Sequence, residues 1–201
     1  MIIIVSEKYL KIVIFMNTNN KKIVEANIKI IRSLPFNKRE KYEQKAFEQF
    51  KIFLKKIPQN EKIAFWLNSP DEINVMPWIS HALNLGYIVY LIRFEKHKKI
   101  SFVEIKDINF EKEWFKNRLQ PKKTKNKIQK IFVNAFFVPL PIFNLKKEFC
   151  EDELYLINNL ISAVKYKSIV GFAYSLQCFH KIDFKERIFL VDYLITNAYT
   201  I

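Results

Sequence analysis

The amino-acid sequence predicts an α/β fold: a single-domain, three-layer α/β/α sandwich with a mainly parallel sheet. One observation behind this is that short apolar runs alternate along the chain with segments of helical periodicity, which is typical of strand–helix–strand units. Another is that half of the 201 residues are hydrophobic and 15% are aromatic. A chain of this length and composition can bury a sizeable core within one domain.

Two helices are predicted at the start of this pattern. Apolar residues recur at helical spacing over residues 22–33. A stronger helix is predicted over residues 37–56, with Asn37 as N-cap and Glu40 three residues later. Pro58 ends this helix, and its apolar face carries Ala46, Phe47, Phe50, Phe53 and Leu54.

The alternation of strands and helices follows. The predicted strands are residues 62–67, 87–92, 100–105, 130–138, 168–173 and 191–196. The predicted helices among them are residues 74–85, ended by Gly86, then 111–116, and 151–166, which opens with the acidic residues that a helix dipole favours. Ligands of parallel sheets bind beyond the carboxyl ends of the strands. Residues 68–72, Arg93, Asn144 and residues 174–177 are therefore expected near one edge.

Glycine is scarce in this chain. Gly86 and Gly171 are the only two, where average usage would give roughly fourteen. Phosphate-binding loops need glycine because the backbone must adopt positive φ and approach the anion closely. No P-loop or GxGxxG motif can be written. If the protein binds a nucleotide, side chains must hold most of the phosphate.

The charge and the cysteines suggest the kind of partner and the compartment. A net charge of +14 attracts anions such as nucleotides, polyglutamate tails, nucleic acid or acidic lipid. The lysine-rich residues 122–127 contain no aromatic residue or arginine, so we expect a solvated loop there and no nucleic-acid site. Cys150 and Cys178 form no CxxC pair and indicate reduced thiols of a cytoplasmic protein.

Two further kinds of site are not expected. No apolar run is long enough to span a membrane, which predicts no membrane partner. The three histidines do not cluster at metal-ligand spacing, which predicts no protein-built metal site.

Residues 1–15 form a short apolar stretch ahead of Met16 and the polar residues 17–22. The stretch lacks the basic region and the small-residue cleavage site of a signal peptide. Two interpretations stay open: a gene start placed too far upstream, or an extra edge strand. The predicted α/β domain comprises residues 16–201.

The last third of the chain resembles the ending of a known enzyme family. Residues 170–177 read VGFAYSLQ, and residues 191–197 read VDYLITN. They are similar to the Gly-x-Ala-Tyr/Phe-x-x-Gln and Asp-x-hydrophobic-hydrophobic-Thr-Glu motifs of the 5-formyltetrahydrofolate cyclo-ligases, or methenyltetrahydrofolate synthetases. Further fragments resemble that family in the right order and spacing: residues 63–73, 86–93, 100–102, 119–121 and 138–144.

The departures from the family pattern fall on the nucleotide side. Where the family has a glycine loop that opens a helix, residues 149–159 read FCEDELYLINN, with three carboxylates and neither glycine nor arginine. Carboxylates at that place repel a phosphate. Gln120 replaces the glutamate of the family's Glu-Pro pair, and Asn144 replaces its loop aspartate. The substrate-side features are kept better than the ATP-side features.

The resemblance implies ATP-dependent cyclisation of 5-formyltetrahydrofolate to 5,10-methenyltetrahydrofolate, with ATP and Mg²⁺ as cofactors and a folate as substrate. In this reaction the formyl oxygen is phosphorylated, and a second nitrogen of the folate then closes the ring as phosphate leaves. The implied substrate-binding residues are Glu72, Trp66, Phe143 and Gln177. The candidate phosphate-binding residues are Lys21, Lys22, Arg32 and Arg93, although each taken alone fits a solvated surface charge better. No catalytic residue is assigned.

Each substrate-side residue also has a purely structural interpretation. Glu72 can be a carboxylate at a helix amino terminus, Gln177 can bond the backbone of its loop, and Trp66 can belong to the core. Three functions stay open. The first is a divergent, monomeric cyclo-ligase, and the second is a degenerate paralogue that binds folate or a partner without ATP chemistry. The third is a basic RNA-associated α/β protein, which only the charge supports.

Overall fold

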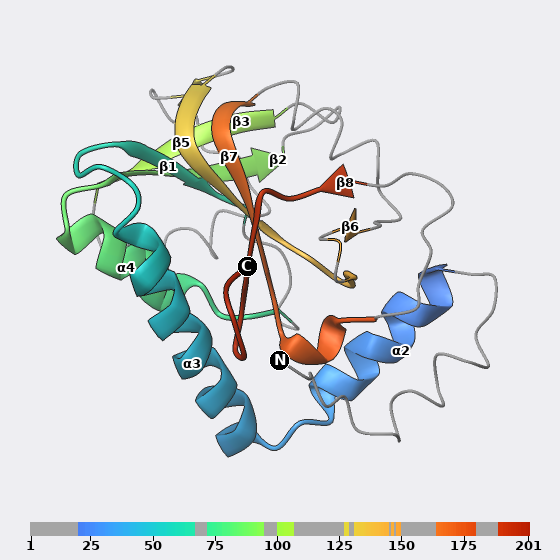
Figure 1. Ribbon diagram of the computed structural model, residues 1–201. Helices are drawn as coiled ribbons and strands as arrows, with labels where there is room; N and C mark the ends of the chain where they lie inside the picture. Colours follow the sequence, from blue (N-terminus) through green and yellow to red (C-terminus); the bar gives the residue numbers. More distant parts are fainter. Residues whose placement is uncertain are drawn as a thin grey trace.

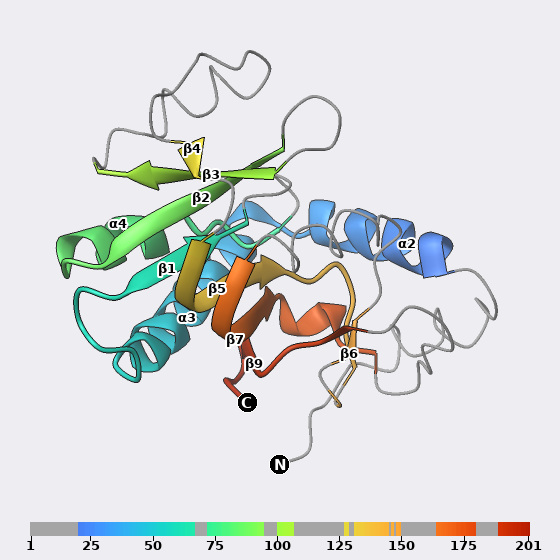
Figure 2. The same cartoon turned by 90° about the horizontal axis from the view of Figure 1, so that it is seen from above.

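A seven-stranded sheet forms the centre of the molecule (Figures 1 and 2). The computed structural model describes residues 20–66, 72–94, 100–106, 127–128, 131–144, 146, 148–149, 164–179 and 189–201. The strand order is β4-β3-β2-β1-β5-β7-β9. The strands are β1 Lys62–Phe65, β2 Ile88–Phe94, β3 Ile100–Ile105, β4 Lys127–Ile128, β5 Ile131–Pro139, β7 Val164–Ala173 and β9 Tyr193–Thr196.

The sheet is mainly parallel, as predicted. Strands β2, β1, β5, β7 and β9 pair in parallel, while β3 and β4 extend one side of the sheet in antiparallel pairs. A separate antiparallel pair joins β6 (Glu148–Phe149) to β8 (Phe189–Leu190). Because the five parallel strands run the same way, their carboxyl ends all meet at one edge of the sheet.

Helices α3 (Phe36–Leu54) and α4 (Met76–Asn84) cover one face of the sheet (Figure 1). Apolar residues at helical spacing on α3 are buried there, as predicted for Ala46, Phe50, Phe53 and Leu54. The Phe50 ring stacks on Trp78 at 4.8 Å and meets Phe137 edge-on at 5.5 Å. Large aromatic rings therefore fill the space between these helices and the sheet.

The opposite face of the sheet is buried as well. Its apolar cluster includes Trp66, Tyr90, Phe136 and Phe143. The helix predicted at 111–116 lies outside the described residues, as do residues 151–163 of the helix predicted over 151–166. Residues 1–15, Cys150 and the lysine-rich residues 122–126 lie outside them as well. Among the described helices, none has both the length and the apolar character needed to span a membrane.

The helix predicted over residues 151–166 is wrong at its end, because residues 164–166 belong to β7. Val164 is buried and Tyr166 partly buried, whereas Lys165 and Lys167 are exposed. This alternation has the period of a half-buried strand, and both apolar residues are of types that favour strands. β7 therefore begins before the predicted residue 168.

Two smaller predictions are also corrected. Asn37 is not the N-cap of α3: the cap is Pro35, at φ −55° and ψ 142°, and Asn37 lies inside the helix. Proline fits this position because its ring fixes φ near the observed value. Lys127 and Ile128, predicted within a loop, form β4 against β3. The short pair β6–β8 was not predicted, whereas the other described strands and helices follow the predicted order.

Candidate functional site at the carboxyl edge of the sheet

The segments that follow the parallel strands form what we call the carboxyl edge: Trp66, residues 140–144, residues 174–177 and Asn197. The connections after β5 and β7 are joined there by their backbones. Leu140 N–H donates to the Phe172 carbonyl at 2.9 Å, and Phe143 N–H donates to the Gln177 carbonyl at 3.0 Å. Residues 140–144 and 174–177 are therefore in direct contact, and this brings Asn144 and residues 174–177 to one edge, as predicted.

Gln177 ties these two connections together through its side chain. Its Oε1 accepts from the Tyr174 N–H at 2.7 Å, and its Nε2 donates to the carbonyls of Leu140 at 3.0 Å and Pro141 at 2.9 Å. Both amide protons are used, and the residue is buried. This is the backbone-bonding role that the sequence left open for Gln177, and it fixes the shape of the carboxyl edge.

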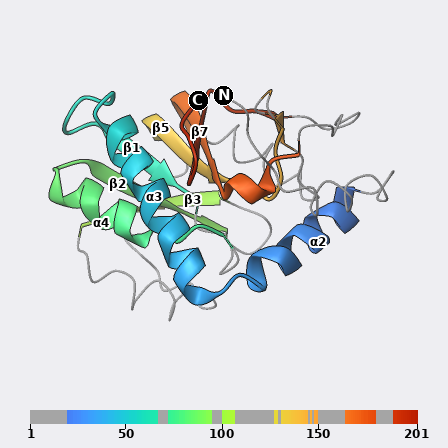
Figure 3. The ribbon, with the colours of Figure 1, turned by 60° about the horizontal axis from the view of Figure 1, so that its bottom comes forward.

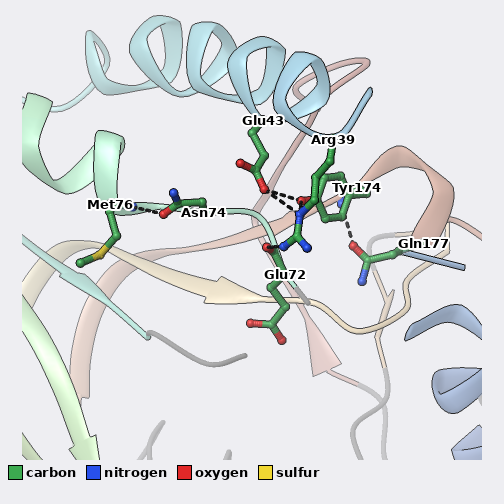
Figure 4. Close-up of polar contacts among 7 residues, drawn as sticks. All are labelled: Arg39, Glu43, Glu72, Asn74, Met76, Tyr174 and Gln177. Carbon is green, nitrogen blue, oxygen red and sulfur yellow. Dashed lines mark hydrogen bonds and ion pairs between the residues drawn. The ribbon is translucent and has the colours of Figure 1, made fainter. Parts of the chain in front are cut away.

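A charged cluster made by Arg39, Glu43 and Tyr174 joins α3 to the end of β7 (Figure 4). The Tyr174 hydroxyl donates to Glu43 Oε1 at 2.6 Å and accepts from Arg39 Nε at 3.1 Å. Arg39 Nε also lies 3.1 Å from Glu43 Oε1. The three side chains therefore form a closed triangle of hydrogen bonds, which we call the Arg39 cluster.

The ionisation of the Arg39 cluster is fixed by its surroundings. Burial raises the pKa of the Tyr174 hydroxyl, and the hydrogen bond to Glu43 raises it further. Burial alone would lower the pKa of Arg39, but Tyr174 and Glu43 outweigh it, so that pKa is raised. Tyr174 therefore keeps its proton and Arg39 its charge at neutral pH.

Glu72 lies beside this cluster. Its backbone carbonyl accepts from Arg39 Nη2 at 3.1 Å, and in Figure 4 its carboxylate points away from Arg39, Glu43 and Tyr174. The first turn of α4, which begins at Met76, contains no acidic residue. The alternative interpretation of Glu72 as a dipole-stabilising carboxylate in that turn therefore has no support. The N-cap of this helix is Val75, and Asn74 just before it accepts from the Met76 N–H through its Oδ1 at 3.0 Å.

Trp66 and Phe143 belong to the apolar cluster on the sheet face opposite α3. Trp66 is 3% exposed and Phe143 is fully buried. The backbone N–H of Trp66 donates to the Phe137 carbonyl at 2.9 Å, which continues the pairing of β1 with β5. Both rings are thus part of the packed core near the carboxyl edge, which agrees with the core interpretation of Trp66.

The four candidate phosphate-binding residues lie on two elements. Lys21, Lys22 and Arg32 belong to α2 (Asn20–Arg32), and Arg93 lies near the end of β2. Figure 3 shows α2 beside the short helix η2 (Ser175–Gln177). One hydrogen bond agrees with this placement: the buried Asn27 of α2 donates through Nδ2 to the Leu176 carbonyl at 3.4 Å. α2 therefore lies along the carboxyl edge.

Sequence reasoning missed Arg39, Glu43 and Asn197 as residues of this edge. Asn197 Oδ1 accepts from the Ser175 N–H at 2.7 Å and so holds η2 from the end of β9. Arg39 and Glu43 are four residues apart on the half-buried side of α3. The sequence feature that could have identified these two residues is a pair of opposite charges on the apolar side of a predicted helix.

Neither glycine of the chain can cradle a phosphate at the carboxyl edge. Gly171 lies inside β7, paired with Val138 and Leu194, and a Cβ there would lie 2.5 Å from Leu140 Cδ1. Gly86, at φ +84°, makes the turn before β2 and so lies at the opposite edge. The described residues contain no group of three or more His, Cys, Asp or Glu that could hold a metal ion. The backbone thus does not fit a nucleotide in the manner of a glycine loop.

Comparisons with known proteins agree with the fold. The sequence matches no protein-family model and no curated protein. The 5,10-methenyltetrahydrofolate synthetase of Aquifex aeolicus superposes with a TM-score of 0.69 at 17% identity, over 90% of each chain. That of Mycoplasma pneumoniae gives 0.65 at 14% identity, over 90% of this chain and 99% of the other. The chain therefore has the fold of the 5,10-methenyltetrahydrofolate synthetases.

Proposed function

We propose that this chain is a divergent 5,10-methenyltetrahydrofolate synthetase that binds a folate at the carboxyl edge of its sheet. The observation that carries the proposal is the fold match to two such synthetases over 90% of this chain. The sequence motifs in residues 170–177 and 191–197 resemble the same family independently of the fold. The proposed reaction is the cyclisation of 5-formyltetrahydrofolate to 5,10-methenyltetrahydrofolate.

The proposed substrate-binding residues would bind the folate partly through charge and partly through apolar packing. A pterin requires apolar walls and a few convergent polar groups. Glu72, with its carboxylate directed away from the Arg39 cluster, is the proposed partner of the pterin nitrogens. Trp66 and Phe143, which are buried, would support the apolar wall of the site from the core, and Gln177 would hold the loop that carries Phe143.

ATP and Mg²⁺ are the part of the proposal that the chain supports least. ATP would activate the formyl oxygen, but the two glycines lie where they cannot hold its phosphates. Only side chains remain, and we propose Lys21, Lys22, Arg32 and Arg93 for this role. A side chain can replace one backbone donor but not a whole nest. We therefore expect ATP to bind much more weakly than folate and turnover to be slow or absent.

This departure favours a second candidate function, a folate-binding protein of the same fold without ATP chemistry. The cytoplasmic location and the monomeric state remain predictions from the sequence. An RNA-associated role has only the net charge of +14 in its favour.

Folate binding is tested by titrating the purified chain with 5-formyltetrahydrofolate in a calorimeter. We expect Glu72→Gln to raise the Kd at least about tenfold, because a hydrogen bond to a charged group contributes roughly 1.5–3 kcal/mol. Glu40→Gln, the same substitution at an exposed position of α3, serves as the control. Equal affinities of the wild type and Glu72→Gln would remove Glu72 from the site.

Turnover is tested by following methenyltetrahydrofolate absorbance with saturating ATP, Mg²⁺ and 5-formyltetrahydrofolate. Folate binding without turnover supports the second candidate. A rate of about 1 s⁻¹ or more, within the range typical of enzymes, would show that the missing glycine loop is dispensable. Failure of the wild type to bind folate would contradict both candidates.

A further inference from the structure

Arg39 contacts the proposed folate site through the backbone of Glu72. Its guanidinium reaches three oxygens from three parts of the chain: Glu43 Oε1 on its own helix, the Tyr174 hydroxyl after β7, and the Glu72 carbonyl before α4, each at 3.1 Å. The planar, rigid fork of an arginine suits such a set of oxygens, and a lysine cannot reproduce it. Arg39 thus fixes the distance between α3, the end of β7 and the segment that carries Glu72.

The arrangement also links Glu72 to the rest of the carboxyl edge. The Tyr174 side chain contacts Arg39, while its backbone N–H donates to Gln177, which in turn holds the Leu140 and Pro141 carbonyls. Tyr174 is fully buried, so its ring gives the linkage a rigid support. The side chain and backbone of Tyr174 therefore join two sets of hydrogen bonds, and together they link the Glu72 carbonyl to the loop before Phe143.

Arg39 itself is placed for this role and not for direct contact with a folate partner of Glu72. In Figure 4 the guanidinium lies on the α3 side of the Glu72 backbone, whereas the Glu72 carboxylate extends to the other side. The Arg39 side chain is 27% exposed and that of Glu43 is 22% exposed, so water weakens their ion pair only in part. The charge of Arg39 thus serves to hold a carbonyl.

We propose that Arg39 is a positioning residue for folate binding, which orients the Glu72 carboxylate by clamping the Glu72 carbonyl. This inference rests on the proposed function, because it requires that Glu72 bind the folate. It accounts for a charged cluster between a helix and the sheet, where apolar packing alone would hold the helix in place.

The test is a double-mutant cycle with calorimetric titration of 5-formyltetrahydrofolate. We expect Arg39→Gln and Glu72→Gln each to raise the Kd about tenfold, a change that corresponds to about 1.4 kcal/mol. If Arg39 acts through Glu72, the double variant binds about as weakly as either single variant, since the two effects are not independent. Lys45→Gln removes one positive charge from an exposed position of the same helix and is the matched control.

The outcomes separate this inference from the proposed function. An unchanged Kd for Arg39→Gln, or a hundredfold rise for the double variant, overturns the positioning role while folate binding stands. A wild-type chain that does not bind folate overturns both. Should Arg39→Gln fail to fold, Arg39→Lys keeps the charge but loses the fork, and it is expected to raise the Kd as well. Wild-type affinity in Arg39→Lys would then contradict the proposal.

Discussion

The two halves of helix α3 hold it to the sheet by different means. The carboxyl-terminal half packs against the sheet through rings: Phe50 against Phe137 at 5.5 Å, and Phe53 against Tyr193 at 5.0 Å. The amino-terminal half is held by the hydrogen bonds of Arg39 and Glu43. Apolar packing is strong but has little directional preference, whereas hydrogen bonds fix position. The comparison indicates that one half of α3 supplies stability and the other sets the geometry of the carboxyl edge.

The largest effect is expected in the aromatic half. Phe50→Ala removes a fully buried ring, and the cavity and lost transfer energy should lower the free energy of unfolding by about 3–5 kcal/mol. Urea unfolding measures this loss. Phe36→Ala, the same change at the 80% exposed start of the helix, should have little effect. Equal losses in the two variants would contradict the assignment of stability to the buried ring.

The second effect concerns the polar half. Tyr174→Phe removes the hydroxyl that bonds Glu43 and Arg39, which should lower the free energy of unfolding by about 1.5–3 kcal/mol. Folate affinity should also fall, because Arg39 loses one of its supports. Tyr42→Phe, on the same helix and only partly buried, is the control. A Tyr174→Phe protein with wild-type stability would show that the hydroxyl contributes nothing net.

The third effect concerns Gly171 of β7, which faces Leu140 and Val191 on the side of the sheet opposite α3. Gly171→Ala would place a Cβ 2.5 Å from Leu140 Cδ1, in a closely packed region, and overpacking of this kind costs about 1–3 kcal/mol. Thermal unfolding measures the loss. Leu140→Ala removes the clashing atoms, so the double variant should be more stable than the sum of the two single effects predicts. If the losses of the two single variants simply add in the double variant, the strain does not arise from contact between residues 171 and 140.

The smallest effect is a pH dependence at the margin of the aromatic half. Burial lowers the pKa of His81, with a contribution from Lys51 that Glu48 opposes. The His81 ring meets Phe47 edge-on at 5.5 Å. A folded-state pKa below the unfolded value of about 6.5 contributes stability above pH 6.5, and this is lost as the pH falls below it. Between pH 7.5 and pH 5.5, the thermal midpoint should fall further in the wild type than in His81→Gln. The difference between the two falls should be less than about 4 °C. An equal fall of the thermal midpoint in the two proteins would show that His81 does not cause the pH dependence.

The sequence predicted the apolar half of α3 better than the polar half, for a physical reason. Ala46, Phe50, Phe53 and Leu54 recur at helical spacing, so local periodicity alone identified the buried face. The partners of the polar half are distant in the sequence: Glu43 and Tyr174 are separated by 131 positions. No local pattern encodes such a contact.

The errors in the predicted elements have local causes as well. Residues 164–166 were assigned to a helix because the preceding residues have helical character, whereas the alternation of Val164, Lys165, Tyr166 and Lys167 already had the period of a strand. The expected shared edge of Asn144 and residues 174–177 was correct, because it follows from the parallel order of the strands. The proposed site roles could not be predicted in the same way, because they depend on contacts with a bound ligand. Neither the sequence pattern nor the packing of the chain specifies such contacts for Glu72, Trp66, Phe143 and Gln177.

The packing of α3 against the last strand of the sheet has a consequence for how the chain folds during synthesis. α3 packs against β9, and Gln49 of the helix bonds Thr200, which lies 151 positions later. The aromatic side of α3 therefore leaves the ribosome long before the strand that covers part of it. Contacts between such distant segments close large loops and form slowly, and an exposed aromatic surface is prone to aggregation meanwhile. We expect efficient folding in the cell to depend on protection of the nascent α3 until the last parallel strand is made.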